Sequence, residues 1–432
     1  MDSRDRHPPR IDRRAALALP AGLLGVAGAC AGRRPRAEAA ELDELFSDLE
    51  DRSGDYRPIT AEEKRPRFAR LGAALRAANQ DALLIEPGAT LDYLVDVRWG
   101  RSERLFALVV LADGTLFWLS PAFEAPRAER RIASSGAPQG PIVTWDEHEY
   151  AWEPLASALH ARAVERIALE PEARAFVAER LAGAFGRERV QSGAEVVLAL
   201  RGKKEAREIE LLRGASELTQ RAIAAVAERL RPGLTDAEVG RWMRHAQERL
   251  GLASTWVLPL LNADAALPHG SSTERVLAPG DVVLVDTGGG LHGYQSDITR
   301  TWVFAAEPPA EVERAWNAVR DAQKRGFEAL RPGAPCAAAD RAARASIEAA
   351  GYGAGYASFT HRLGHGIGVE GHEEPYLDGG NELPLRPGMT FSDEPGIYLP
   401  GRFGVRIEDI VCITVDGADH FGAWQRSPAS PA

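Results

Sequence analysis

Cysteine is scarce in this 432-residue sequence, which contains only Cys30, Cys336 and Cys412. Three thiols in a chain of this length exclude a disulfide framework. They also leave too few sulfur ligands for a cysteine-rich zinc site. We expect Cys336 and Cys412 to be core or surface residues.

Long apolar runs and a surplus of basic residues are missing as well. No apolar run reaches the ~18 residues that a membrane-spanning helix requires. The 52 Lys and Arg residues against 62 Asp and Glu residues give a net charge of −10, which argues against a nucleic-acid partner. Neither a GxSxG nucleophile motif nor a phosphate-binding loop occurs. The remaining composition predicts a soluble protein of about two domains.

The N-terminus differs from the rest of the chain. Arginines precede an apolar run from Ala15 to Ala29, which ends at Cys30. This pattern predicts an export signal over residues 1–32, and Arg13-Arg14 favours the twin-arginine route. The sequence before Cys30 resembles a lipoprotein cleavage site, so a periplasmic or cell-envelope protein with a lipid anchor as its only membrane contact is expected. The alternative is a leader without a targeting role.

Residues 33–60 are charged and lack a hydrophobic period, which predicts a tether. Residues 61–202 alternate short apolar strands with helical stretches, and Asp113-Gly114 marks a hairpin turn. This alternation predicts an α/β domain. The expected strands are DALLIE, the two arms of LFALVVLADGTLFWLS, PIVTW and RIALE.

A long helix over about 203–230 is expected to open a second domain, residues 203–432, which contains an internal duplication. Leu-Arg-Pro-Gly at 230–233 recurs at 330–333, and Leu-Ala-Pro-Gly at 277–280 is echoed by Leu-Arg-Pro-Gly at 385–388. Asp286 and Glu394 each follow the Leu of the second motif by nine residues. Two related halves are therefore predicted to place a carboxylate at equivalent positions.

Two predicted hairpins bring four carboxylates to these strands. Asp286 and Asp297 face each other in the first half, Glu394 and Glu408 belong to the second, and His365 adds an imidazole. Buried carboxylates without partners are costly, and like charges ~4 Å apart repel by ~4 kcal/mol at an effective dielectric near 20. The cluster therefore predicts two divalent ions. Oxygen-rich ligation with one imidazole favours manganese, with cobalt, zinc or iron as alternatives.

Four segments resemble motifs of the pita-bread metallopeptidases, in particular the Xaa-Pro branch of prolidases and aminopeptidases P. They are GDVVLVDTGGGLHGYQSDITRT, HRLGHGIGVEGHEEP, GMTFSDEPGIY and GVRIEDIV. WGRSERL in the first domain extends the resemblance, which covers about residues 60–425. The resemblance implies an α/β N-terminal domain followed by an α+β pita-bread catalytic domain, creatinase/methionine aminopeptidase-like, with pseudo-twofold halves.

The resemblance also implies roles for single residues. Asp286 and Asp297 match ligands of one ion, His365 and Glu394 match ligands of the other, and Asp297 and Glu408 match bridging ligands. Glu394 would in addition act as general base. Pocket residues that bind substrate or stabilise the oxyanion are matched by His269, His361, His372, Tyr398 and Arg406. Asp393 departs from the family pattern, and its extra charge is expected to tune the site.

The expected activity is hydrolysis of Xaa-Pro bonds in short peptides, by a dipeptidase or an aminopeptidase P. The preference for proline rests on the resemblance alone. One alternative keeps the fold and the ions but acts on a small non-peptide molecule, and another is a binding module with a dead site. By analogy, a homodimer or larger homo-oligomer is expected.

Overall fold

The computed structural model of the protein describes residues 34–271 and 273–432. These residues fall into two compact units, of which one ends at Ser47 and the other spans Asp48–Ala432. The predicted export signal lies outside the described residues. Within them, every helix is too short or too polar to cross a membrane.

The interval predicted as a tether contains regular structure. Helix α1 spans Arg34–Leu45, a short 3-10 turn spans Ser53–Asp55, and residues from Asp48 onward belong to the larger unit. The sequence of α1, RPRAEAAELDEL, is rich in Ala, Glu, Leu and Arg. These residues favour a helix through backbone propensity and need no apolar stripe, which is why a search for periodicity overlooks this element.

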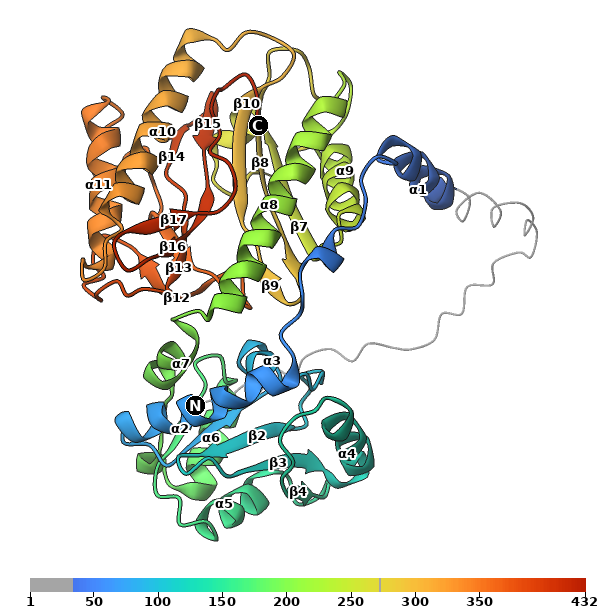
Figure 1. Cartoon of the computed structure of the whole chain (residues 1–432), viewed down its shortest axis with the longest axis vertical. Coiled ribbons are helices and arrows are strands. Elements are labelled where there is room, and N and C mark those ends of the chain that lie inside the picture. The colour runs from blue at the N-terminus through green and yellow to red at the C-terminus, as the bar shows by residue number, and fades with distance from the viewer. Residues whose placement is uncertain (1–33, 272) are drawn as a thin grey trace, which may run out of the picture. The chain divides into compact units, whose positions relative to one another are not determined.

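The first domain of the larger unit is a mixed six-stranded sheet with the order β4-β3-β2-β1-β5-β6 (Figure 1). Strand β2 is antiparallel to both β1 and β3, and the other neighbours are parallel. All residues of β1 and β2 are buried because apolar cores cover both faces of the sheet. The strands are β1 (Ala82–Ile85), β2 (Ala107–Leu111), β3 (Leu116–Pro121), β4 (Ile142–Trp145), β5 (Ile167–Leu169) and β6 (Val190–Ser192).

Six α-helices accompany this sheet. Helix α2 begins at a capping box in which Thr60 and Glu63 satisfy each other's backbone N–H groups. The predicted hairpin is present, with Gly114 at φ +88° in the turn between β2 and β3. The helices are α2 (Ala61–Ala77), α3 (Ala89–Leu94), α4 (Ala125–Ser134), α5 (Trp152–His160), α6 (Ala175–Phe185) and α7 (Ala194–Arg201).

The second domain begins with α8 (Ala206–Arg229), where the sequence predicts a long helix. Figure 1 shows α8 and α9 beside β7 and β8, and α10 and α11 together on the other side of the domain. The other helices are α9 (Asp236–Arg249), η4 (Asn262–Ala266), α10 (Ala310–Ala329) and α11 (Cys336–Ala349). Cys336 and Cys412 are buried free thiols, as expected for core residues.

Three sheets form the centre of this domain. The first has the order β10-β8-β7 with β9 paired to β8, the second has the order β12-β11-β13-β16-β17, and the third pairs β14 with β15. The strands of the first sheet are β7 (Ala253–Leu261), β8 (Val282–Leu291), β9 (Tyr294–Gln295) and β10 (Ile298–Val303). Those of the other two are β11 (Gly364–Gly366), β12 (Glu373–Leu377), β13 (Thr390–Asp393), β14 (Gly396–Leu399), β15 (Phe403–Arg406), β16 (Asp409–Ile413) and β17 (Ala418–His420).

The duplicated motifs make the same contacts in each half. The Gly233 N–H donates to the Leu277 carbonyl at 2.8 Å, and the Gly333 N–H donates to the Leu385 carbonyl at 2.9 Å. In each half, the Pro-Gly turn between two helices is thus hydrogen-bonded to the Pro-Gly motif that precedes the strand leading to Asp286 or Glu394. The four motif glycines adopt positive φ values, namely Gly233 (94°), Gly280 (92°), Gly333 (85°) and Gly388 (92°). The structure therefore has the predicted fold class: an α/β domain followed by an α+β domain of two related halves.

Candidate metal centre

The acids of the first half lie on adjacent antiparallel strands. Asp286 on β8 is opposite Thr299 on β10, and Asp297 directly precedes β10. Thr299 also forms an isolated bridge to Glu408, whose N–H donates to the Thr299 carbonyl at 3.0 Å. This bridge joins the two halves at the point where their carboxylates meet.

The second half contributes His365 on β11 and Glu394 at the end of β13. The Nε2 atom of His365 lies 3.6 Å from Oδ2 of Asp297 and 3.5 Å from Oε1 of Glu394. Its Nδ1 atom lies 3.0 Å from the Gly366 carbonyl. Because a carbonyl can only accept, Nδ1 carries the proton and Nε2 presents its lone pair to the carboxylates.

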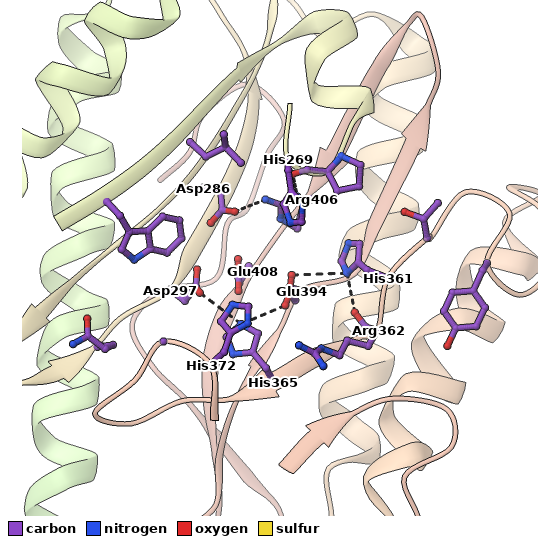
Figure 2. Close-up of a pocket in the computed structure, with 17 residues that line it drawn as sticks. His269, Asp286, Asp297, His361, Arg362, His365, His372, Glu394, Arg406 and Glu408 are labelled. Atoms are coloured by element: carbon purple, nitrogen blue, oxygen red, sulfur yellow. Dashed lines mark hydrogen bonds and ion pairs between the residues drawn. The ribbon is translucent and has the colours of Figure 1, made fainter. Parts of the chain in front are cut away.

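All five predicted ligands therefore meet in one place (Figure 2). In each of three overlapping groups, the donor atoms lie within 4.8 Å of one another. Asp297, His365 and Glu408 each belong to two of these groups, so the groups share ligands and form one continuous cluster. The groups are Asp286–Asp297–Glu408, His365–Glu394–Glu408 and Asp297–His365–His372.

The charges of this cluster are not balanced by the protein. Burial, followed by the neighbouring acids, raises the pKa values of Asp297 and Glu408 well above their usual range. Burial also raises the pKa of Glu394 to about 7. Asp286 Oδ1 is buried without a hydrogen-bond partner. Crowded, desolvated carboxylates with a free oxygen fit divalent cations, which would supply the missing charge.

Arg406 is the cation nearest to these acids, and its donors are used within the protein. Its guanidinium pairs with Asp286 and donates to the Tyr398 hydroxyl at 2.9 Å. It also donates to the Thr299 hydroxyl at 3.1 Å and to the Pro268 carbonyl at 3.3 Å. Arg406 and Tyr398 thus lie beside the ligands, as the resemblance implies, and Arg406 holds Asp286 in place.

The three predicted pocket histidines line the same cavity, which has a volume of about 1000 Å³. His361 Nε2 lies 2.7 Å from the Tyr398 hydroxyl, and its Nδ1 lies 2.8 Å from the Arg362 carbonyl. The His372 ring stacks on His365 with centroids 3.7 Å apart. Burial lowers the pKa of His361 to about 3 and also lowers the pKa of His372, so both rings are neutral at physiological pH.

Asp393 lies on the strand that leads to Glu394 and is completely buried. Its carboxylate oxygens lack hydrogen-bond partners, and its cross-strand neighbour is Asp409. Burial, Asp409 and Glu394 raise the pKa of Asp393 well above its usual range. Asp393 and Glu394 therefore influence each other electrostatically, although the tuning role predicted for Asp393 stays a prediction.

Arg362 is a charged pocket residue that was not predicted from the sequence. Arg362 lines the cavity (Figure 2). Its guanidinium lies 3.7 Å from the centroid of the Tyr376 ring. Across residues 34–271 and 273–432, its side chain forms no hydrogen bond or ion pair. Its place directly after His361 in HRLGHGIG is a signal that could have drawn attention to it.

Comparisons with known proteins agree with this geometry. Residues 67–202 match the Creatinase/Prolidase N-terminal domain, and residues 210–415 match metallopeptidase family M24. The probable dipeptidase PepE of Mycobacterium tuberculosis is 40% identical over 367 residues, covering 84% of this chain and 95% of the relative. The Xaa-Pro dipeptidase of Lactobacillus helveticus is 32% identical over 357 residues, covering 80% and 94%.

A solved structure extends the similarity to three dimensions. The crystal structure of dipeptidase PepE from Mycobacterium ulcerans superimposes with a TM-score of 0.79 at 35% identity, covering 86% of this chain and 98% of that one. The matched ranges span both domains and contain every candidate ligand. The chain therefore belongs to metallopeptidase family M24 and has the pita-bread fold of that family.

Proposed function

We propose that this metallopeptidase hydrolyses Xaa-Pro dipeptides with the help of two divalent manganese ions. The observation that carries the proposal is the meeting of Asp286, Asp297, His365, Glu394 and Glu408 in one cavity. The names of the relatives, which include dipeptidases and an Xaa-Pro dipeptidase, support the substrate class. The single imidazole among oxygen donors supports manganese.

Each residue of the site has its own role in peptide hydrolysis. Two divalent cations bound to the five ligands would supply Lewis acidity and make water more acidic. Glu394 accepts the proton of the attacking water as general base. The neutral ring of His372 donates a hydrogen bond to the scissile carbonyl as it becomes an oxyanion. The single N–H of neutral His361 already donates to the Arg362 carbonyl, so His361 lines the pocket with its Nε2 beside the Tyr398 hydroxyl. His269 contacts the amino-terminal side of the substrate.

The position of Arg362 favours dipeptides over longer peptides as substrates. The pocket contains two arginines, and Arg406 is already paired with Asp286. The hydrogen-bond donors of Arg362 remain available to a substrate. The positive charge of Arg362 also opposes the rise in the pKa of Glu394, which shows that Arg362 acts electrostatically on the metal centre. A dipeptide places a carboxylate one residue beyond the scissile bond, where a longer peptide has a neutral amide. Arg362 is suited to bind that carboxylate.

The test uses the full chain loaded with manganese and offers Ala-Pro, Ala-Pro amide and Ala-Pro-Ala. We expect turnover of Ala-Pro, and we expect Arg362→Gln to raise its KM at least about tenfold, because a hydrogen bond to a charged group contributes about 1.5–3 kcal/mol. The KM for the amide should be unchanged. Equal effects on Ala-Pro and the amide would contradict carboxylate binding. Absence of hydrolysis with both ions bound would indicate a non-peptide substrate.

A further inference from the structure

A buried ion cluster connects the first domain to the segment that carries His372. We call Arg201, Lys204 and Glu373 the domain clamp, and residues 367–372, between β11 and β12, the histidine loop. Arg201 is the last residue of α7, and Lys204 lies between α7 and α8. Glu373 opens β12, directly after His372.

The clamp contacts are short and specific. An Arg201 guanidinium nitrogen lies 2.7 Å from Glu373 Oε1, and Lys204 Nζ lies 2.9 Å from Glu373 Oε2. The same Arg201 nitrogen donates to Glu370, within the histidine loop, at 2.6 Å. The Glu373 side chain is 5% exposed and the Lys204 side chain 2%. Both carboxylate oxygens of Glu373 are therefore held by cations from outside the histidine loop.

The clamped carboxylate also shapes the loop itself. Glu373 Oε1 accepts the Glu370 N–H at 3.1 Å. A Cβ atom added to Gly368 would lie 2.7 Å from both Glu373 oxygens, so the loop backbone rests directly on the carboxylate. The Glu373 carboxylate thus fills the inside of the loop and fixes its path.

The two ends of the histidine loop carry the groups that matter for chemistry. His365 lies two residues before the loop and His372 is its last residue, and their rings stack at an interplanar angle of 21° (Figure 2). His365 is held independently, because its backbone N–H donates to Ser392 Oγ at 3.0 Å and its Nδ1 lies 3.0 Å from the Gly366 carbonyl. His372 has no such support of its own among the hydrogen bonds of the described residues. Its position depends on the loop and on Glu373.

We propose that Arg201 and Lys204 are positioning residues that place His372 for catalysis by fixing Glu373. The first domain thereby contributes to the reaction without contacting substrate. This inference rests on the proposed peptidase function. The contacts that hold His365 and Glu394 lie outside the clamp. Loss of the clamp should therefore misplace the His372 ring and lower its contribution to catalysis, while cation binding stays intact.

The experiment is a double-mutant cycle on the manganese-loaded full chain. We expect Arg201→Gln to lower kcat for Ala-Pro about 10- to 100-fold with bound manganese unchanged. In the His372→Ala background the same substitution should lower kcat less than about threefold, because the residue on which it acts is gone. Arg201→Lys, which keeps one charged contact, should recover part of the activity. Equal losses in both backgrounds, or loss of manganese, would overturn the proposal.

Arg70→Gln is the matched control, because Arg70 of α2 also forms an ion pair across the domain boundary, with Glu205 at 2.5 Å. This variant should keep wild-type kcat. If it lost as much activity as Arg201→Gln, general loosening of the domains would explain both. Hydrogen exchange gives a readout that needs no activity: peptides covering 367–373 should exchange faster in Arg201→Gln and not in Arg70→Gln. Unchanged exchange in Arg201→Gln would refute the clamp even if the enzyme hydrolysed no peptide. Should Arg201→Gln fail to fold, Lys204→Met undergoes the same comparison.

Discussion

The metal centre and the domain clamp both bury carboxylates, yet the pKa values of these carboxylates shift in opposite directions. In the clamp, Lys204 and Arg201 more than offset the effect of burial, and the pKa of Glu373 falls to about 2. In the metal centre, one arginine faces four acids, and the pKa values of Asp297, Glu394 and Glu408 rise. A cluster that the protein neutralises itself is structural, whereas a cluster left with excess negative charge is suited to bind cations.

The largest expected effect comes from the acid assigned as general base. Glu394→Gln keeps the size and one oxygen ligand but cannot accept a proton. We expect kcat to fall by about 10²–10⁴-fold, the usual contribution of general acid–base catalysis, with an unchanged far-ultraviolet circular dichroism spectrum. Steady-state kinetics with Ala-Pro tests this, together with metal analysis of the variant. Activity within about tenfold of wild type would contradict the assignment of the base.

Removal of the cations should destabilise the protein, and more so at higher pH. Ions present at a hundred times their Kd stabilise the folded state by about 2.7 kcal/mol per site. In the cation-free protein, raised pKa values mean that the folded state binds protons that the unfolded state has released, so stability is lost as the pH rises through those values. Urea unfolding with and without chelator, at pH 6 and pH 8, measures the difference. Asp297→Asn should reduce this pH dependence, and an equal loss at both pH values would contradict the charge imbalance.

A smaller effect is expected at the cross-strand pair Asp393 and Asp409. Arg300 holds Asp409 at 2.6 Å and, although burial opposes ionisation, the pKa of Asp409 is lowered. Asp393 has no such partner, so Asp393→Asn should stabilise the protein at pH 8 by about 1 kcal/mol and less at pH 5. Thermal unfolding at the two pH values tests this. The control Asp409→Asn should be destabilising at both, and a loss of stability at pH 8 in Asp393→Asn would show that the carboxylate is needed there.

Much of the centre could be predicted from the sequence because its residues lie at fixed offsets from turns. The Pro-Gly motifs place Asp286 and Glu394 equivalently, and the structure repeats the turn contacts in both halves. Acids at the ends of apolar strands are costly to bury without partners, so four of them together indicate a cation site. Tyr398 and the three pocket histidines followed only from the family resemblance, since spacing alone does not bring them to the same cavity.

The sequence could not predict contacts made across long separations by residues of ordinary type. Arg201 and Glu373 are 172 residues apart, and although Glu373 lies within the segment HRLGHGIGVEGHEEP, no local pattern pairs it with Arg201. Arg362 was overlooked because its place after His361 gives a position in the motif but does not show that its donors face the cavity unused. Helix α1 was overlooked because it lacks an apolar stripe. In each case the deciding information is spatial.

The bridge between Thr299 and Glu408 has a consequence for biogenesis. Asp286 and Asp297 are synthesised well before Glu408, which is the ligand common to the two main donor groups and follows both of them in the sequence. A ribosome-bound chain that stops short of this residue therefore lacks a complete set of donors for either ion. Neither of these donor groups can bind a cation with its full set of ligands before Glu408 has been synthesised and the two halves have met at the Thr299–Glu408 bridge.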